Sequence, residues 1–374
     1  MSAAKWQHCT RREFLSGSTA LGLSAACILP VGNAAATPDK ERVYRVGVIN
    51  AARGNLHSWH FFQAFHSSID MDALAKNQRK QMGEMYRKWL RNPQVVGAEP
   101  PFLDTRITHV FDKDAEAAGQ FAEVFSGVRP VKKVEQMVRE VDAVLLGDAI
   151  GNGEDHFDLI APALEAGLPT FCDKPLADKP TRAAEILSLA EKHGTPLMSS
   201  SLFRHFAEVL HVARLRETGE FGKLQWLTVG YGAACIDNFI PVYAIHPVWA
   251  VAAICGVGFE GASLVRYEGS CLLTITFQNR PPATVWMGGD NQGTAHFSQK
   301  SETFALFGSD SGNVKWHARY SRTVAHLVQT IREMIRSKRQ PFSSRELLEV
   351  VAATHAAIKS VQENGRVVAL EEVL

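Results

Sequence analysis

Apolar runs alternate with helical patterns through the first half of the chain. The run 43–49 is apolar and rich in β-branched residues, as a strand covered on both faces of a sheet should be. Strands that alternate with helices predict a parallel, doubly wound sheet of the Rossmann type with right-handed crossovers. Further strand-like runs occupy 106–111, 142–146, 168–172 and 196–201, and helical patterns occupy 59–66, 115–125, 156–166 and 181–193.

The pattern changes after Phe206. One helix is followed by strand-like runs that only short turns separate, and such consecutive strands predict an open, mainly antiparallel sheet. Two helical patterns, 323–335 and 345–363, end the chain. The strand-like runs of this half are 225–229, 262–267, 271–277, 284–287 and 303–307. We therefore expect an α/β protein with a Rossmann domain at 42–201 and a second α/β domain at 202–374.

A polar segment rich in Lys and Arg, from about 70 to 101, interrupts the first domain. A strand–helix–strand crossover does not need this length. We therefore expect an insertion made of a helix and a loop.

The first 36 residues have the pattern of an export signal. Arg11 and Arg12 precede a weakly apolar stretch, and the small residues 34–36 suit a signal peptidase. The competing interpretation is an uncleaved membrane anchor, but the stretch is short and interrupted for the roughly 20 apolar residues that a spanning helix needs. We expect a twin-arginine signal peptide, export by that machinery and a periplasmic or otherwise extracytoplasmic location. Because the twin-arginine route carries folded proteins, it also suggests a cofactor acquired before export.

Composition and charge exclude some classes of protein. The chain of 374 residues is long enough for two domains, and a formal charge of +1 gives no electrostatic reason to expect a nucleic-acid partner. Beyond the signal, the cysteines are Cys172, Cys235, Cys255 and Cys271, which an oxidising compartment allows to pair in three ways. Their spacing matches no metal site, and we expect buried, unpaired thiols rather than disulfides.

A motif in the middle of the chain resembles one known family. Residues 142–146 read DAVLL, His156 follows, and 163–177 read ALEAGLPTFCDKPLA. This series is similar to the core motif of the Gfo/Idh/MocA family, the relatives of glucose-fructose oxidoreductase and inositol dehydrogenase. Arg204 resembles the arginine of the family's N-x-R motif, which implies a substrate contact. The resemblance covers about 43–374 and is strongest over 142–206.

Lys174 is the first candidate catalytic residue. It follows an apolar strand, and ligands of open α/β sheets bind beyond the carboxyl ends of such strands. Pro175 restricts the backbone of Lys174, and a partly desolvated lysine has a lowered pKa that lets it exchange a proton with a hydroxyl. The resemblance places this lysine between nicotinamide and substrate, and it places Asp173, Pro175 and His156 near the cofactor.

His246 is the second candidate catalytic residue. The family's D-x-x-x-H motif implies that its histidine is the acid/base for the reacting hydroxyl. Here 242–246 read VYAIH, which keeps the histidine and lacks the aspartate. Asp237 or Tyr243 are the candidates to replace that carboxylate, and the alternative is a histidine of the core or of a helix cap.

The turn after the first strand is the expected nucleotide site. Against the dinucleotide motif G-x-G-x-x-G, the segment 48–57, VINAARGNLH, has Asn50, Ala52 and Asn55 in place of the glycines. A second alignment matches Arg53 and Gly54 to the R-G-x-x-H that resembles the turn of exported family members. Gly54 would then permit the close approach of phosphate, whereas the methyl of Ala52 would crowd it. The turn is either a working or a degenerate nucleotide site.

Asp112 ends the second strand, where a carboxylate can accept hydrogen bonds from both ribose hydroxyls of an adenosine. The competing role is that of a helix N-cap. The adjacent Lys113 suits a 2′-phosphate, so both NAD and NADP remain possible. His57 and His60 have a spacing that suggests a metal site, but no carboxylate or cysteine completes a ligand set. We expect no metal.

The resemblance implies hydride transfer between a hydroxyl of a carbohydrate or cyclitol and C4 of a nicotinamide, with Lys174 and His246 handling the hydroxyl proton. Because free dinucleotide is scarce outside the cytoplasm, NAD or NADP should stay tightly bound. The resemblance also implies a homo-oligomer built on the second sheet. Two other functions fit: an NAD-dependent glycoside hydrolase on the same fold, and a non-catalytic carbohydrate-binding protein, which the altered turn and the missing aspartate favour.

Overall fold

The computed structural model describes most of the chain from residue 42 onward. The described residues are 42–49, 56–70, 72–73, 76, 102–148, 151–220, 222–232, 243–288, 293–297, 303–305 and 314–374. The expected signal peptide, most of the expected insertion, the turn at 50–55, Cys235 and Asp237 lie outside them. Residues 38–374 form one compact unit.

The first sheet is parallel and has six strands in the order β3-β2-β1-β4-β5-β6. This order confirms the predicted Rossmann arrangement, and it reverses between β1 and β4, where such folds bind their ligands. The strands are β1 (Tyr44–Ile49), β2 (Thr105–Phe111), β3 (Arg129–Pro130), β4 (Ala143–Leu146), β5 (Thr170–Cys172) and β6 (Leu197–Met198).

Successive residues of these strands face two separate apolar layers, which explains why the runs are apolar throughout. Along β4, Ala143 and Leu145 belong to one layer, and Val144 and Leu146 to the other. The helices of this part are α2 (Leu56–His60), α5 (Ala115–Val124), α6 (Val134–Met137), α7 (His156–Glu165) and α8 (Pro180–Lys192), with the 3-10 helix η2 (Phe62–Phe65). The predicted helix 59–66 is thus an α-helical turn followed by a 3-10 turn.

The second sheet is mixed and has seven strands in the order β12-β11-β7-β10-β9-β8-β13. Only the pair β7–β10 is parallel among the described strands of this sheet, so the prediction of a mainly antiparallel sheet is confirmed. The strands are β7 (Leu224–Tyr231), β8 (Phe259–Tyr267), β9 (Ser270–Phe277), β10 (Arg280–Met287), β11 (Gly293–Phe297), β12 (Thr303–Ala305) and β13 (Val368–Ala369).

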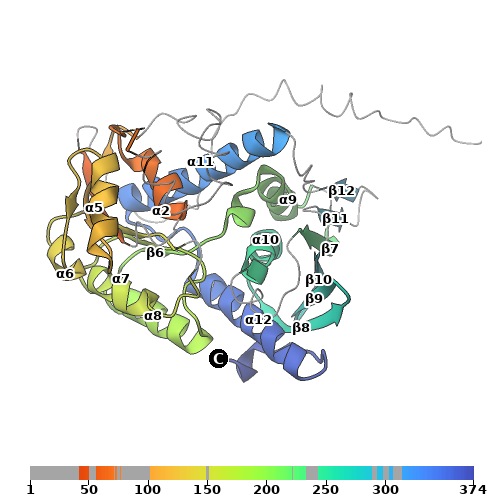
Figure 1. The fold of residues 1–374 in the computed structure, drawn as a ribbon. Coiled ribbons are helices and arrows are strands. Elements are labelled where there is room, and N and C mark those ends of the chain that lie inside the picture. The colour runs from red at the N-terminus through yellow and green to blue at the C-terminus, as the bar shows by residue number, and fades with distance from the viewer. Residues whose placement is uncertain are drawn as a thin grey trace, which may run out of the picture. The chain divides into compact units, whose positions relative to one another are not determined.

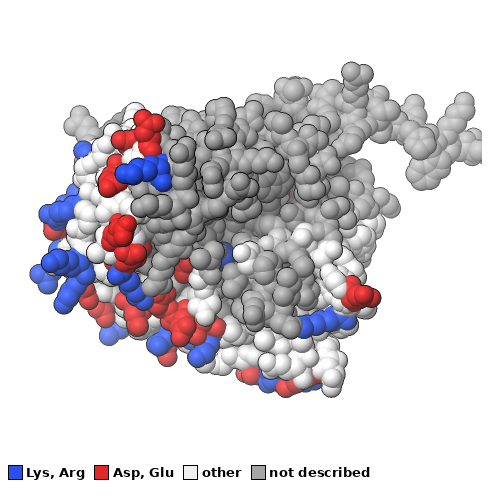
Figure 2. All heavy atoms as spheres, viewed as in Figure 1, with Lys and Arg blue, Asp and Glu red and all other residues white. Residues whose placement is uncertain are grey.

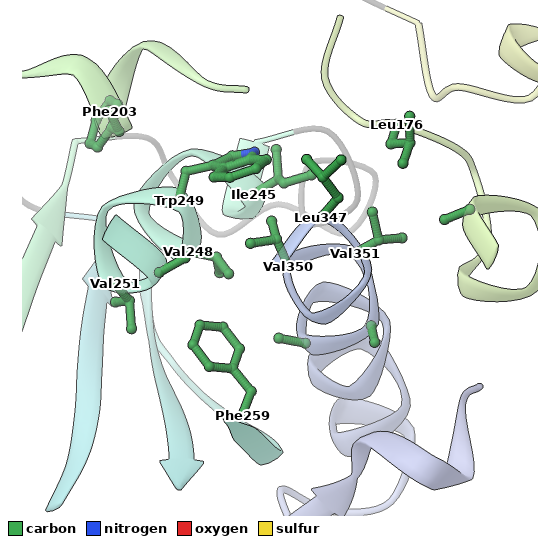
Figure 3. Close-up of a cluster of buried hydrophobic side chains, with 14 of the residues drawn as sticks. Leu176, Phe203, Ile245, Val248, Trp249, Val251, Phe259, Leu347, Val350 and Val351 are labelled. Atoms are coloured by element: carbon green, nitrogen blue, oxygen red, sulfur yellow. The ribbon is translucent and has the colours of Figure 1, made fainter. Parts of the chain in front are cut away.

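Helices α10 (Ile245–Cys255) and α12 (Ser344–Gln362) pack against each other beside this sheet. Figure 3 shows Leu347 and Val350 of α12 pointing toward Ile245 and Trp249 of α10. The other helical segments are η3 (Leu202–His205), α9 (Ala207–Thr218), α11 (Val314–Ser337) and η5 (Leu370–Glu372). Among the described residues, no helix combines the length and apolar character that crossing a membrane requires.

Helix α11 follows the second sheet in the sequence but packs onto the first. Its side chains Leu327, Val328 and Ile331 lie in the same apolar layer as Val46 of β1 and Phe62 of η2. Figure 1 shows α11 running beside α2. The core around the first sheet is therefore completed by a segment from the second half of the chain.

The cysteines differ from expectation at one position. Cys172 and Cys255 are free and buried, as expected. Cys271, which is fully buried in β9, is disulfide-bonded, and its partner lies outside the described residues. The expectation of unpaired thiols is therefore wrong for Cys271, because sequence spacing does not reveal which thiols the fold brings together.

The view in Figure 2 shows acidic and basic side chains interspersed on the described surface, over the part of the molecule that contains α6, α7 and α8. Mixed charges of this kind suit an ordinary solvated surface.

Candidate active site

The candidate site lies at the carboxyl ends of β4, β5 and β6. Asp148 follows β4, Lys174 follows β5, and Ser199–Ser201 follow β6. Because parallel strands end at the same edge of a sheet, these segments meet there. Their side chains are buried, with Lys174 only 1% exposed.

Asp173 holds this edge together. Its Oδ2 lies 2.5 Å from Nδ1 of His57 and accepts the backbone N–H of Asp148 at 2.8 Å, and its Oδ1 accepts the N–H of Lys174 at 2.8 Å. The carboxylate thus joins α2, which follows the expected nucleotide turn, to the segment that carries Lys174. Asp173 was predicted to contact the cofactor, and in the structure both of its oxygens already have protein partners.

Lys174 lies beside Tyr243, with Nζ 5.4 Å from the centre of the tyrosine ring. Burial lowers the pKa of Lys174 below its ordinary value, and the negative charges of Asp173 and Asp148 act in the opposite direction. A lowered pKa increases the neutral fraction of the amine, which is the form that accepts a proton.

His246 lies in the same cluster. Its ring is 5.9 Å from that of Tyr243, and its Nδ1 is 2.6 Å from Oγ of Ser201. Burial holds the pKa of His246 well below its ordinary value, and the nearby Lys174 and His57 lower it further. The structure therefore brings Lys174, Tyr243 and His246 together, and it makes His246 neutral at pH 7.

The described partner of Nδ1 of His246 is Ser201, which the sequence did not suggest. Among the described residues, the hydrogen bond to Nδ1 comes from Ser201 rather than from Tyr243, and Asp237 lies outside the described residues. Ser201, His57 and Asp148 are site residues that sequence reasoning missed. The R-G-x-x-H match contained a signal for His57, whereas nothing in the sequence pattern marks Ser201.

Part of the chain that forms this site is similar in sequence to known oxidoreductases. Residues 81–201 match the model of an oxidoreductase family described as having an NAD-binding Rossmann fold, GFO_IDH_MocA. Inositol 2-dehydrogenase of Corynebacterium glutamicum is 33% identical over 124 residues, which are 32% of this chain and 36% of that protein. Over this segment, the chain is similar to the Gfo/Idh/MocA family. It spans little more than a third of the length of this curated relative.

Solved structures of the same fold extend the likeness over most of the chain. A myo-inositol dehydrogenase from C. glutamicum matches with a TM-score of 0.64 and 15% identity, covering 88% of this chain and 99% of that one. An oxidoreductase from Agrobacterium radiobacter, in complex with NAD+, L-tartaric acid and magnesium, matches with a TM-score of 0.60 and 15% identity. It covers 88% of this chain and 99% of that chain. At these identities, the likeness concerns the fold.

The described part of the site has features that suit a bound dinucleotide. Asp112 follows β2, is only 5% exposed and accepts the N–H of Asp114 at 2.8 Å. Asp114, not Asp112, caps α5, so the competing N-cap role is wrong. At the end of β4, a Cβ on Gly147 would lie 2.3 Å from Oγ of Ser58, so α2 packs directly on this strand end.

Lys113 forms an ion pair with Asp155 at 2.7 Å. This carboxylate neutralises the cation that suggested a 2′-phosphate. The expected positions Asn50, Ala52, Arg53, Gly54 and Asn55 lie outside the described residues, and their contact with a cofactor stays a prediction.

His156 is fully buried. Its Nδ1 is 3.3 Å from Sγ of Cys172 and its Nε2 is 3.4 Å from Asp148. Burial alone would lower the pKa of His156, but Cys172 and Asp148 raise it well above its ordinary value. His156 therefore supports Asp148. Potential metal-ligand atoms of Asp148, Asp155 and His156 also lie within 4.8 Å of one another. The sequence did not predict this cluster. Asp155 already forms an ion pair with Lys113.

Arg204 belongs to η3, and its side chain contacts α12. Its guanidinium forms an ion pair with Glu346, and it stacks 3.9 Å from the ring centre of Phe342. The side chain is 16% exposed, and that of Glu346 12%. The structure thus gives Arg204 a contact inside the fold, and its predicted contact with substrate stays a prediction.

Proposed function

We propose that the protein is an oxidoreductase that transfers hydride between a hydroxyl of a carbohydrate or cyclitol and a tightly bound NAD or NADP. The main support is the cluster of Lys174, Tyr243 and His246 at the carboxyl edge of a Rossmann sheet. The name of the inositol dehydrogenase relative and the NAD+ in the A. radiobacter structure point to the same substrate and cofactor classes.

In this proposal, Asp112 would bind the adenosine ribose of the dinucleotide, and residues 50–55 would hold its pyrophosphate. A bound nicotinamide supplies the hydride acceptor. Lys174 and His246 hold the reacting hydroxyl, and the burial of Lys174 limits the access of water to the proton transfer. Asp173 positions Lys174 through its hydrogen bond with the backbone N–H of that residue.

Two measurements test this function on protein purified after export. Mass spectrometry of nucleotide released on denaturation identifies the cofactor, and nicotinamide absorbance follows its reduction in a single turnover with aldoses, cyclitols and glycosides as donors. We expect nucleotide in the folded protein and reduction by at least one donor. Bound nucleotide that no donor reduces would favour a binding protein, and release of free sugar from an aryl glycoside would favour a glycosidase.

We also propose that the protein works outside the cytoplasm. Arg11 and Arg12 before a weakly apolar stretch support this location, and so does the disulfide of Cys271, since disulfides persist in oxidising compartments. Replacing both arginines with lysine should keep the protein in the cytoplasm with residues 1–36 attached. Unchanged export of that variant in a cell-fractionation assay would refute the signal.

A homo-oligomer is the third part of the proposal. Trp226, Tyr267 and Trp286 on strands of the second sheet are 41%, 53% and 39% exposed, which supports a face that a second copy covers. Light scattering of the purified protein at several concentrations measures the oligomeric state directly.

A further inference from the structure

Two adjacent serines after β6 each bind a histidine, one five residues away and the other 45 residues away. Ser200 Oγ lies 2.9 Å from Nε2 of His205, and Ser201 Oγ lies 2.6 Å from Nδ1 of His246. Both serines are at most 2% exposed. Only the second pair involves a candidate catalytic residue.

The hydrogen bonds of Ser201 determine where the proton of His246 lies. A hydroxyl has one proton to donate and two lone pairs to accept with. Within the described part of the chain, Oγ of Ser201 makes two hydrogen bonds: it accepts the backbone N–H of Phe203 at 3.2 Å and pairs with Nδ1 of His246. Its own proton is left for Nδ1, because a buried O–H without an acceptor costs about 1 to 3 kcal/mol.

A neutral imidazole carries one proton. His246 is neutral, since burial and the nearby Lys174 and His57 hold its pKa well below the ordinary value. If Nδ1 accepts from Ser201, the proton must lie on Nε2. A carboxylate at the same position would do the opposite, because a carboxylate only accepts and would require the proton on Nδ1.

We propose that Ser201 is a positioning residue that fixes His246 with its proton on Nε2, so that His246 donates a hydrogen bond to the substrate oxygen and Lys174 takes the proton. This inference rests on the proposed function. In the oxidative direction, the carbon–hydrogen bond breaks and its hydride passes to the nicotinamide. The oxygen–hydrogen bond breaks and its proton passes to neutral Nζ of Lys174, while the carbonyl forms. His246 keeps its own proton throughout.

The surroundings of both groups fit this division of roles. Lys174 has the lowered pKa that a proton acceptor needs, and it faces the carboxylates of Asp173 and Asp148, which stabilise the ammonium that forms. The ring of Phe203 lies 5.8 Å from that of His246. The ionisable groups recorded around the two residues are His57, Asp148, Asp173, Tyr231 and Tyr243.

The first test reads the tautomer without any turnover. Holoprotein labelled with 15N-histidine is examined by NMR, and His246 is assigned by comparison with His246→Gln. We expect a directly bonded hydrogen on Nε2 and none on Nδ1, both in the wild type and in Ser201→Thr, which keeps the hydroxyl. A proton on Nδ1 of wild-type His246 would overturn the inference.

The second test uses Ser200→Ala as the matched control, because it removes a hydrogen bond to a buried histidine from the neighbouring serine. We expect Ser201→Ala to lower the single-turnover rate at least tenfold and to leave nucleotide content unchanged, whereas Ser200→Ala and Ser201→Thr keep most of the rate. Equal rates in Ser201→Ala and Ser200→Ala would refute the positioning role.

The pH profile separates the proton acceptor, Lys174, from the hydrogen-bond donor, His246. The rate of oxidation should rise with pH through one ionisation below 10.5, the ordinary value of a lysine. This rise should persist in His246→Gln, which retains an N–H donor, and disappear in Lys174→Met. A rise that persists in Lys174→Met would refute the inference. If His246 has the expected tautomer but none of the tested donors reduces the bound cofactor, the result counts against the proposed function rather than against the role of Ser201.

Discussion

At the scale of single residues, the site depends on a lysine that is almost completely buried. Lys174→Met keeps an unbranched apolar side chain and removes the amine, so folding and nucleotide content should be retained. If Lys174 accepts the hydroxyl proton, the single-turnover rate should fall by about 100- to 10,000-fold, as is typical of general acid–base catalysis. Absorbance of the bound nicotinamide measures this rate. Turnover at the wild-type rate would break the link between this residue and the chemistry.

Asp112 is the second residue whose role can be isolated. Asp112→Ala should reduce nucleotide occupancy, because hydrogen bonds from ribose to a carboxylate contribute about 1.5 to 3 kcal/mol each. Asp114→Ala is the matched control: it removes the cap of α5, which costs about 1 kcal/mol of stability, and leaves the ribose contact in place. Mass spectrometry measures the nucleotide content of both variants, and we expect a loss in Asp112→Ala only. Equal content in Asp112→Ala and wild type would exclude Asp112 from the site.

The sequence identified Lys174 and His246 and missed the residues that hold them. The DKP motif is local, so its position after a strand could be predicted. His57 and Asp173 are separated by 116 residues, and Ser201 and His246 by 45. Such pairs depend on how separate elements approach one another, and no periodicity or spacing in the chain encodes them.

At the scale of elements, helix α10 shows where pattern reading fails. Of its eleven residues, all except His246 are buried. A helix that is apolar on every side has no amphipathic period, so nothing distinguished it from a strand or a core loop. The strands of the first sheet were predictable for a related reason, since short apolar runs bounded by turn residues suit strands covered on both faces.

The ion pair between Arg204 and Glu346 connects the 3-10 helix η3 to helix α12. Glu346→Gln should lower the free energy of unfolding by about 3 kcal/mol, because it leaves a largely buried guanidinium without its counter-charge. The double variant Arg204→Met with Glu346→Leu should lose less than that, since neither charge remains.

Urea denaturation measures both effects. Arg182→Met is the control, because its pair with Glu185 is exposed and should contribute less than about 1 kcal/mol. A Glu346→Gln variant as stable as the control would mean that water already solvates the Arg204 guanidinium.

At the scale of the whole molecule, buried histidines predict how stability depends on pH. Burial lowers the pKa of most of the shifted histidines, that of His60 to about 3. A histidine with a lowered folded-state pKa stabilises the fold fully above about 6.5, its unfolded value, and this contribution is lost as pH falls toward the folded value. His156 has a raised pKa and acts in the opposite sense. The lowered histidines are His60, His66, His109, His205, His246, His326 and His355.

We therefore expect the melting temperature to fall as the pH is lowered from 6.5 to 4. Each unit by which the fold lowers the pKa of a buried histidine corresponds to about 1.4 kcal/mol of stability. Differential scanning calorimetry at constant ionic strength measures it. A melting temperature that rises on acidification over this range would show that His156 and the surface charges outweigh the buried imidazoles.

Helix α11 has a consequence for how the protein is made. Its residues 324–335 complete the apolar layer over the first sheet, yet the ribosome adds them after nearly nine-tenths of the chain. A nascent chain that ends at 201 has every strand of the Rossmann sheet and still exposes the surface that Leu327, Val328 and Ile331 cover. The order of synthesis thus postpones closure of the core until translation is almost over, and we expect the first half, excised at 201, to expose this apolar surface.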